Sequence, residues 1–117
     1  DTITLPIGVD NGVMVERKRV KVFTSRRIIG SKITETIGWE LTLVNKRSNP
    51  ITFKLKDQVP ISTDKSIQVK PNELSGGMLE EETGIITWDV QLDAGKTKNI
   101  KFTYSVDYPK DKQIYLE

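Results

Sequence analysis

Residues 34–45 read TETIGWELTLVN, and apolar side chains occupy every second position from Ile37 onward. Glu40 and Thr42 fall on the opposite face of an extended chain. This alternation is typical of a β-strand with one buried and one solvated face. The apolar face is expected to hold Ile37, Trp39, Leu41 and Leu43. The stretch therefore predicts a strand of an antiparallel sheet.

The same period of two continues after the turn RSNP at residues 47–50. In ITFKLKDQV (51–59), Asp57 has the same parity as the apolar residues, so a carboxylate is expected to point inward. KSIQVK (65–70) is a further short strand, with Ile67 and Val69 facing the core. NELSGG, which follows, is expected to be a loop because its paired glycines allow unusual backbone angles.

Two longer alternating stretches follow, IITWDVQL (85–92) and TKNIKFTYSVDY (97–108). The turn DAGK (93–96) between them contains glycine, so the pair is expected to form an antiparallel hairpin. The predicted inward residues are Ile86, Trp88, Val90, Leu92, Ile100, Phe102, Tyr104, Val106 and Tyr108.

The N-terminal third is less regular. Asn11-Gly12, between LPIGVD and VMVERKRVKVF, is a strong signal for a short hairpin turn. FTSRRIIGSK (23–32) shows no clean alternation. Residues 1–32 are therefore expected to form a leading hairpin and edge segment, and residues 33–109 the core.

Short strands with one solvated face, regular turns and no helical periodicity predict an all-β, immunoglobulin-like antiparallel β-sandwich. A closed barrel is the alternative, since strand count does not separate the two. A length of 117 residues indicates a single domain. Residues expected to hold this fold together are Trp39, Asn45, Asp57, Pro60, Trp88, Gly95 and Tyr104.

The composition excludes several kinds of chemistry. The chain has no cysteine and no histidine, which rules out thiol catalysis, Cys-ligated zinc and any Ser–His mechanism within it. Eighteen basic and sixteen acidic residues give a net charge of +2, so no strong field points to nucleic acid. No apolar run is long enough to cross a bilayer, and no membrane insertion is expected.

Asp57 and Asp64, with Ser62 and Thr63 between them, are weak candidates for a Ca²⁺ site, because Ca²⁺ takes six to eight oxygen ligands. The structural interpretation is that these carboxylates accept hydrogen bonds from nearby backbone N–H groups, such as that of Ser62. Pro60 suits a loop that leaves the sheet. The structural interpretation is favoured, and no cofactor is expected.

Two charged clusters are further candidates for a function. Glu80, Glu81 and Glu82 resemble half of a glycosidase carboxylate pair, but no second carboxylate is specified, so a solvated loop is favoured. ERKRVK (16–21), with Arg26 and Arg27, forms a basic stripe. It is interpreted as a solvent-facing edge in preference to a phosphate site.

Aromatic side chains suggest a stacking platform for sugars. The rings of Trp39, Trp88, Tyr104 and Tyr108 all have core parity, however, so exposure would require shifted strand registers. Phe23 and Tyr115 are the remaining candidates for surface rings.

Three stretches together carry a family resemblance: LPIGVDNGVMVERKRVK, ELTLVNKRSNPITFKLKDQVPISTDKSIQVK and ETGIITWDVQLDAGKTKNIKFTYSVDYPKDK. They resemble the C-terminal region of the bacterial mucoidy inhibitor A-like family. The spaced features shared are Asn45, DQVPIS, Ile67–Val69, Gly84, Trp88, Leu92, Gly95, Tyr104 and Tyr108-Pro109-Lys110.

The resemblance implies that this chain is the C-terminal part of a protein several times longer, with a separate N-terminal domain and a helical stretch upstream. The family's C-terminal region is a domain of unknown function. The name of the family implies a link to the cell envelope, and hence a periplasmic or extracellular location.

From these observations the chain is expected to be a non-catalytic structural or interaction domain. Its expected partners are other domains of the same polypeptide or an envelope protein. The alternative is a module that binds cell-surface polysaccharide, which is motivated by the tyrosines and by the mucoid colony appearance that the family's name implies.

Overall fold

The structure, a computed structural model, describes residues 12–21 and 25–111. In these residues nearly all regular structure is extended, and no α-helix occurs. The strands are β1 (Val13–Arg19), β2 (Ser25–Ile29), β3 (Lys32–Asn45), β4 (Ile51–Gln58), β5 (Gln68–Pro71), β6 (Met78–Glu80), β7 (Ile85–Leu92) and β8 (Thr97–Pro109). Across the described ranges, no helix has the length and hydropathy needed to span a membrane.

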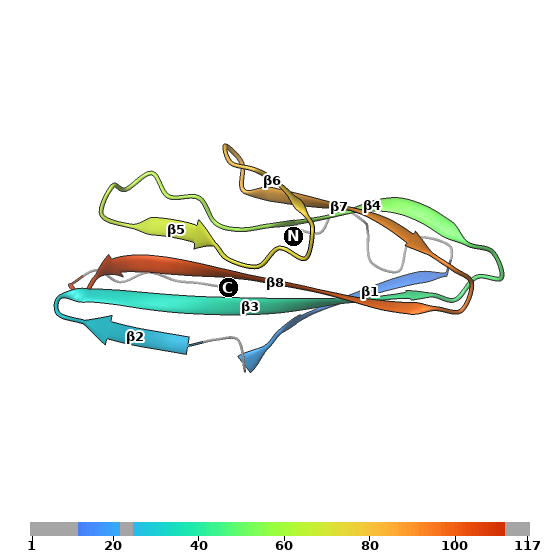
Figure 1. Cartoon of the computed structure of the whole chain (residues 1–117), viewed down its shortest axis with the longest axis horizontal. Coiled ribbons are helices and arrows are strands. Elements are labelled where there is room, and N and C mark those ends of the chain that lie inside the picture. The colour runs from blue at the N-terminus through green and yellow to red at the C-terminus, as the bar shows by residue number, and fades with distance from the viewer. Residues whose placement is uncertain (1–11, 22–24, 112–117) are drawn as a thin grey trace.

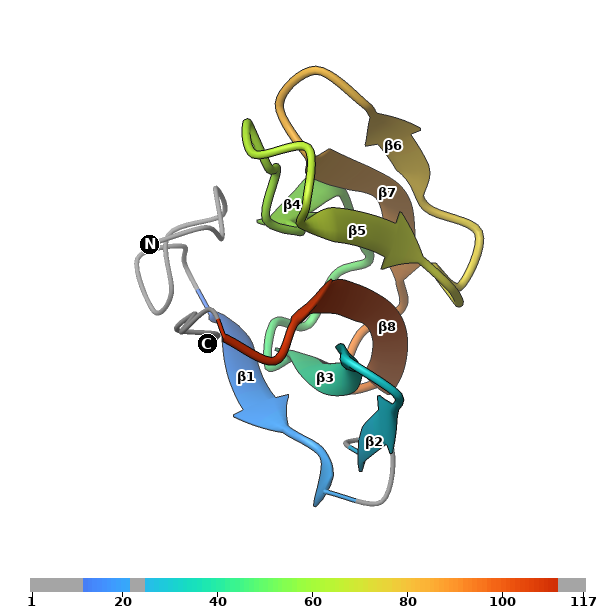
Figure 2. The ribbon, with the colours of Figure 1, turned by 90° about the vertical axis from the view of Figure 1, so that its left-hand side faces the viewer.

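The strands form two antiparallel sheets that face each other (Figure 1). The larger has the order β1-β3-β8-β5, and β2 pairs with β3 on the edge that β1 also uses. The smaller has the order β4-β7-β6. Figure 2 shows β5 on the side of the larger sheet that approaches β6 and β7. This two-layer arrangement is consistent with the predicted sandwich and excludes a single closed sheet among the described strands.

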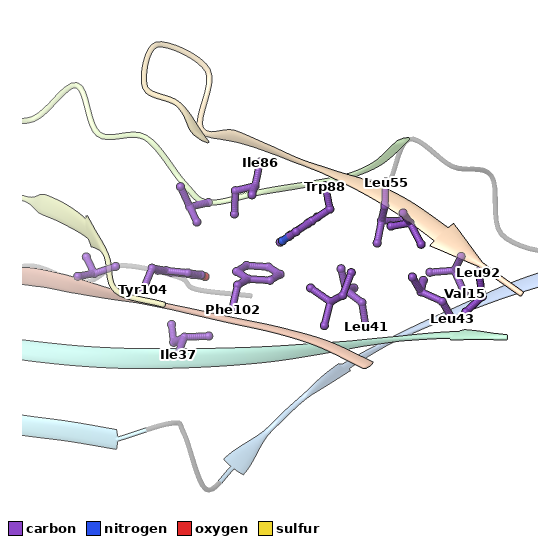
Figure 3. Close-up of a cluster of buried hydrophobic side chains, with 14 of the residues drawn as sticks. Val15, Ile37, Leu41, Leu43, Leu55, Ile86, Trp88, Leu92, Phe102 and Tyr104 are labelled. Carbon is purple, nitrogen blue, oxygen red and sulfur yellow. The ribbon is translucent and has the colours of Figure 1, made fainter. Parts of the chain in front are cut away.

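The core lies between the two sheets, and period-two alternation predicted its members correctly (Figure 3). Every inward residue expected on β7 and β8 is buried. The rings of Trp88 and Phe102 meet across the layers, with centroids 5.8 Å apart. Trp39 differs, because it is only partly buried and packs at the border of the core. Trp88 is therefore the indole that the packing of the two layers encloses.

The predicted hairpin of residues 85–108 is wrong. β7 pairs with β4 and β6, whereas β8 pairs with β3 and β5, so the DAGK turn carries the chain from one sheet to the other. Both strands have a buried face, and alternation alone cannot show whether neighbouring strands pair or face each other. The RSNP turn between β3 and β4 also crosses between the sheets.

Asn45 joins these two crossing turns. Its side chain is fully buried, and Nδ2 donates to the carbonyl oxygens of Asn49, Leu92 and Asp93 at 2.9–3.2 Å. Its Oδ1 accepts the backbone N–H of Arg47 at 2.9 Å. An amide is suited to this position because it both donates and accepts. The structural role predicted for Asn45 thus has a physical basis.

Replacing Asn45 with alanine is expected to lower the free energy of unfolding by about 2 kcal/mol. The substitution leaves buried carbonyl groups of both turns without their donor. Urea denaturation measures the loss, and Asn99→Ala is a control because Asn99 makes a single exposed side-chain bond, to Thr42. Equal effects from the two substitutions would contradict the proposal that Asn45 joins the two turns.

Two strands, β2 and β6, were not predicted from the sequence. FTSRRIIGSK contains β2, which forms a two-residue hairpin with β3 through Gly30 (φ +61°) and Ser31. β6 lies in a stretch expected to be loop. Val15 of β1 also belongs to the core, which therefore begins before residue 33. Of the hairpin expected around Asn11-Gly12, the first arm (5–10) lies outside the described residues, whereas the second arm (13–23) contains β1.

Candidate functional site

Asp57 is the buried carboxylate that the sequence placed on the inner face of β4, and it is fully inaccessible. Arg17 of β1 binds it with both ends of the guanidinium fork: Nε lies 2.8 Å from Oδ2 and Nη2 lies 3.2 Å from Oδ1. The backbone N–H of Gln58 also donates to Oδ1, at 2.7 Å. The carboxylate is therefore neutralised by a cation from the facing sheet.

The expected hydrogen bond from Ser62 to Asp57 is replaced by a local turn. Ser62 Oγ accepts the N–H of Asp64, and Asp64 Oδ1 accepts the N–H and the hydroxyl of Ser66. The hydrogen bonds of Asp57 thus join β4 to β1, whereas those of Asp64 stabilise the loop after β4. No group of three acidic side chains that could hold a metal ion occurs in residues 12–21 and 25–111.

The basic stripe of β1 is not the solvent-facing surface that was expected. Arg17 and Arg19 lie opposite Leu41 and Trp39 in the register, on the inner face of the larger sheet. Their guanidinium carbons lie 3.7 Å and 4.9 Å from the centre of the Trp39 ring. Such stacking favours arginine, whose planar group packs on an aromatic face. These two residues close one side of the core.

The opposite side of the two layers is open and carries a groove of about 500 Å³. We call it the β5 groove. Its walls are β5 on the larger sheet, the loop that follows β4, and β6 with the β6–β7 turn. The lining residues are Val59, Pro60, Ile61, Ser62, Ile67, Gln68, Val69, Lys70, Pro71, Leu79, Glu81 and Gly84.

The groove runs along the backbone edge of β5. Residues 67–71 line it consecutively, whereas a groove on one strand face would contact every second residue. The N–H of Asn72 donates to Thr103 O at 2.9 Å, which marks a hydrogen-bonded position of the β5–β8 ladder. By the alternation of antiparallel ladders, the N–H and C=O of Val69 are directed away from β8. They point to the groove.

Tight packing fixes the wall opposite β5. Val59 N–H donates to Gly84 O at 2.9 Å, and a β-carbon at Gly84 would lie 2.2 Å from Val59 O. Gly84 also has φ +78°, so glycine is required on both counts. Trp88 Nε1 donates to Leu74 O at 2.7 Å and ties the β5–β6 loop to the core. The groove is thus preformed by the fold.

Charged groups beside the groove are acidic on balance. Glu81 lines it, and Glu80 accepts the hydroxyl of Thr83 at 2.7 Å on the same turn. Lys70, also in the lining, binds Asp107 at 3.2 Å. The glutamates at 80–82 are exposed, and Glu81 is the one acidic residue among those that line the groove. The catalytic interpretation of these residues receives no geometric support.

Two titratable groups behind β5 have shifted pKa values. The hydroxyl of Thr34 donates to Asp107 at 2.7 Å and, together with Lys70, lowers the pKa of that carboxyl against the opposing effect of burial. Burial raises the pKa of Tyr108, whose hydroxyl also donates to Glu35 at 2.5 Å. Both groups stabilise the end of the larger sheet.

Thr34→Val is expected to lower the free energy of unfolding at neutral pH by about 1 kcal/mol. Because the pKa of folded Asp107 lies below its unfolded value, its contribution is present above the unfolded pKa. It is lost as pH falls through the folded pKa. The difference between wild type and variant should therefore vanish in acid. Denaturation at a series of pH values measures it, and a constant difference would contradict this explanation.

The aromatic rings considered for sugar stacking are in or beside the core. Trp88, Tyr104 and Tyr108 are buried, and one face of Trp39 is covered by Arg17. Phe23 and Tyr115 lie outside the described residues. The β5 groove was missed in the sequence, although Pro60 and Pro71, which flank it, were possible signals of strand edges.

Comparison with known families identifies a domain of unknown function, as the sequence led us to expect, and does not identify the mucoidy inhibitor A-like family. The family model "Domain of unknown function (DUF4139)" matches residues 2–110. The chain belongs to this family. It is also 27% identical over 124 residues to "Protein F37C4.5" of Caenorhabditis elegans, an alignment that covers 95% of this chain and 22% of the nematode protein.

The chain thus spans about a fifth of the length of that relative. Similar sequences are not confined to bacteria, since this one is from a nematode. No solved structure matches the chain. The description of the family names no function.

Proposed function

We propose that this chain is a non-catalytic interaction domain of a longer polypeptide, and that its β5 groove binds an extended segment. The segment belongs to another domain of the same polypeptide or to a partner in the cell envelope. One observation carries the proposal: an open groove follows the backbone edge of β5 over residues 67–71.

An extended segment is the ligand class that suits a free strand edge. It adds a strand to the sheet, so main-chain hydrogen bonds supply affinity and pockets for alternate side chains supply specificity. Val69 offers the N–H and C=O, and the apolar lining, which includes Ile61 and Leu79, offers contact for side chains. Ile61 is 54% exposed, which is the state expected of a contact residue before binding.

Two further elements of the proposal go with this role. We propose an immunoglobulin-like arrangement of the sheets. The RSNP and DAGK turns support it, because each carries the chain from one sheet to the other. We also propose membership of the mucoidy inhibitor A-like group and an envelope location. The support for both is the sequence resemblance and the match to the domain of unknown function.

A polysaccharide-binding function is less well supported by the geometry. Sugar recognition by stacking needs exposed ring faces. The rings available for it in the described residues are buried or covered, and none of the residues that line the β5 groove is aromatic. The groove therefore favours a peptide ligand.

Ile61→Asp tests the proposal. The substitution is expected to weaken binding of the separately expressed remainder of the polypeptide at least tenfold, or about 1.4 kcal/mol. Folding should be unaffected, because Ile61 is exposed. Met14→Asp is the matched control, since Met14 is 47% exposed on β1, which does not line the groove. Titration calorimetry measures both, and wild-type affinity in the Ile61 variant would overturn the proposal.

A further inference from the structure

A second strand edge is open on this molecule. β2 pairs only with β3 among the described strands, and all five of its residues are exposed. Ile28 and Ile29 are 54% and 65% exposed. Adjacent exposed isoleucines on an edge strand expose both apolar surface and unpaired backbone groups. Such an edge is a site for pairing with another strand.

The two open edges carry opposite charge. Residues 25–36, which contain β2 and the part of β3 that pairs with it, include three basic side chains (Arg26, Arg27, Lys32) and one acidic one (Glu35), a net of +2. Residues 59–84 include two basic side chains (Lys65, Lys70) and five acidic ones (Asp64, Glu73, Glu80, Glu81, Glu82), a net of −3. The β2 edge and the β5 groove are thus electrostatically complementary.

The chemistry of β2 also fits the groove. Its five residues, SRRII, combine apolar side chains with arginines. The strand register places Ile28 and Arg26 on one face, and Arg27 and Ile29 on the other. A strand docked along β5 therefore offers isoleucine to the apolar lining and, from Arg27, a cation to Glu81.

We infer that the β5 groove also binds the β2 strand of a second copy of this chain, in competition with the segment of the proposed function. The inference rests on the proposed function, in which the groove takes an extended segment, and names a second occupant of the same site. The contact joins two different surfaces, so a pair of molecules retains one free β2 and one free groove. Assembly thus grows with concentration unless the rotation between copies closes a ring.

Sedimentation velocity over a range of protein concentrations tests the inference. The wild-type chain is expected to sediment faster as concentration rises, and less so at high salt, because the complementary charges are screened. Arg27→Glu and Glu81→Lys should each be monomeric. Both positions are exposed, and a circular dichroism melt checks that the variants fold.

Sedimentation of a mixture of the two variants is the decisive measurement. The Glu81→Lys chain keeps a native β2, and the Arg27→Glu chain keeps a native groove, so an equimolar mixture should recover association. A wild-type chain that stays monomeric at every concentration overturns the inference, as does a mixture that stays monomeric. If Ile61→Asp still weakens binding of the remaining polypeptide in that case, the interaction function stands and only the self-assembly fails.

Discussion

Replacing Trp88 with alanine is expected to lower the free energy of unfolding by about 4 kcal/mol, the largest effect of any single substitution considered for this chain. The side chain is 4% exposed, lies against Phe102 of the opposite sheet, and donates to Leu74 O. Truncation removes the transfer free energy of the ring, leaves a cavity between the layers, and frees the β5–β6 loop.

Urea denaturation followed by circular dichroism measures this loss, because the substitution removes one of the two tryptophan fluorophores. Met14→Ala is the control: its side chain is half exposed on β1, and a change within about 0.5 kcal/mol is expected. A loss below about 1 kcal/mol for the Trp88 variant would mean that the indole does not join the two layers.

Asp57→Ala is expected to lower the free energy of unfolding by about 3 kcal/mol. Arg17 would keep its charge at a site where its side chain is only 17% exposed, without the fully buried carboxylate that now binds it. The N–H of Gln58 would also lose its acceptor. Removing one partner of a buried pair is costly because the other charge stays desolvated.

A matched pair in the same molecule gives the control. Lys54 and Asp89 are 2.7 Å apart but 67% and 74% exposed, so Asp89→Ala is expected to change stability by less than about 0.5 kcal/mol. The double variant Arg17→Met, Asp57→Leu should lose less than Asp57→Ala alone, because neither residue leaves a buried charge. Equal losses in the single and double variants would contradict the role assigned to the pair.

Alternation predicted which residues are buried, and it did so even for a charged side chain. The inward placement of Asp57 follows from the parity of Leu55, since consecutive residues of a strand point to opposite faces. The partner of Asp57 could not be predicted from this alternation. Arg17 is forty positions away on another sheet, and its own strand shows only that it shares a face with Arg19.

The pairing of strands was harder to predict than their faces. The stretches 85–92 and 97–108 have the pattern of a hairpin, but they belong to different sheets because the DAGK turn is held by Asn45. That contact depends on a side chain about fifty positions earlier. Patterns over a few neighbouring residues cannot reveal this contact. A buried asparagine at the end of a strand does, however, suggest that its side chain binds the backbone of another turn.

The candidate site was missed for a related reason. A groove along a strand edge forms only where a strand lies at the edge of its sheet. The four residues of β5 do not indicate that this strand is at an edge. β6 was missed because three residues with one inward side chain are too few to display a period. The site depends on tertiary arrangement rather than on a motif.

The most direct test of the interaction role is a backbone amide NMR titration of this chain with the separately expressed remainder of the polypeptide. Binding at the β5 groove predicts the largest shift changes in residues 59–71 and slower hydrogen exchange of the Val69 amide, which would gain an acceptor. Shift changes confined to other surfaces, with the exchange rate of Val69 unaltered, would contradict the role assigned to β5.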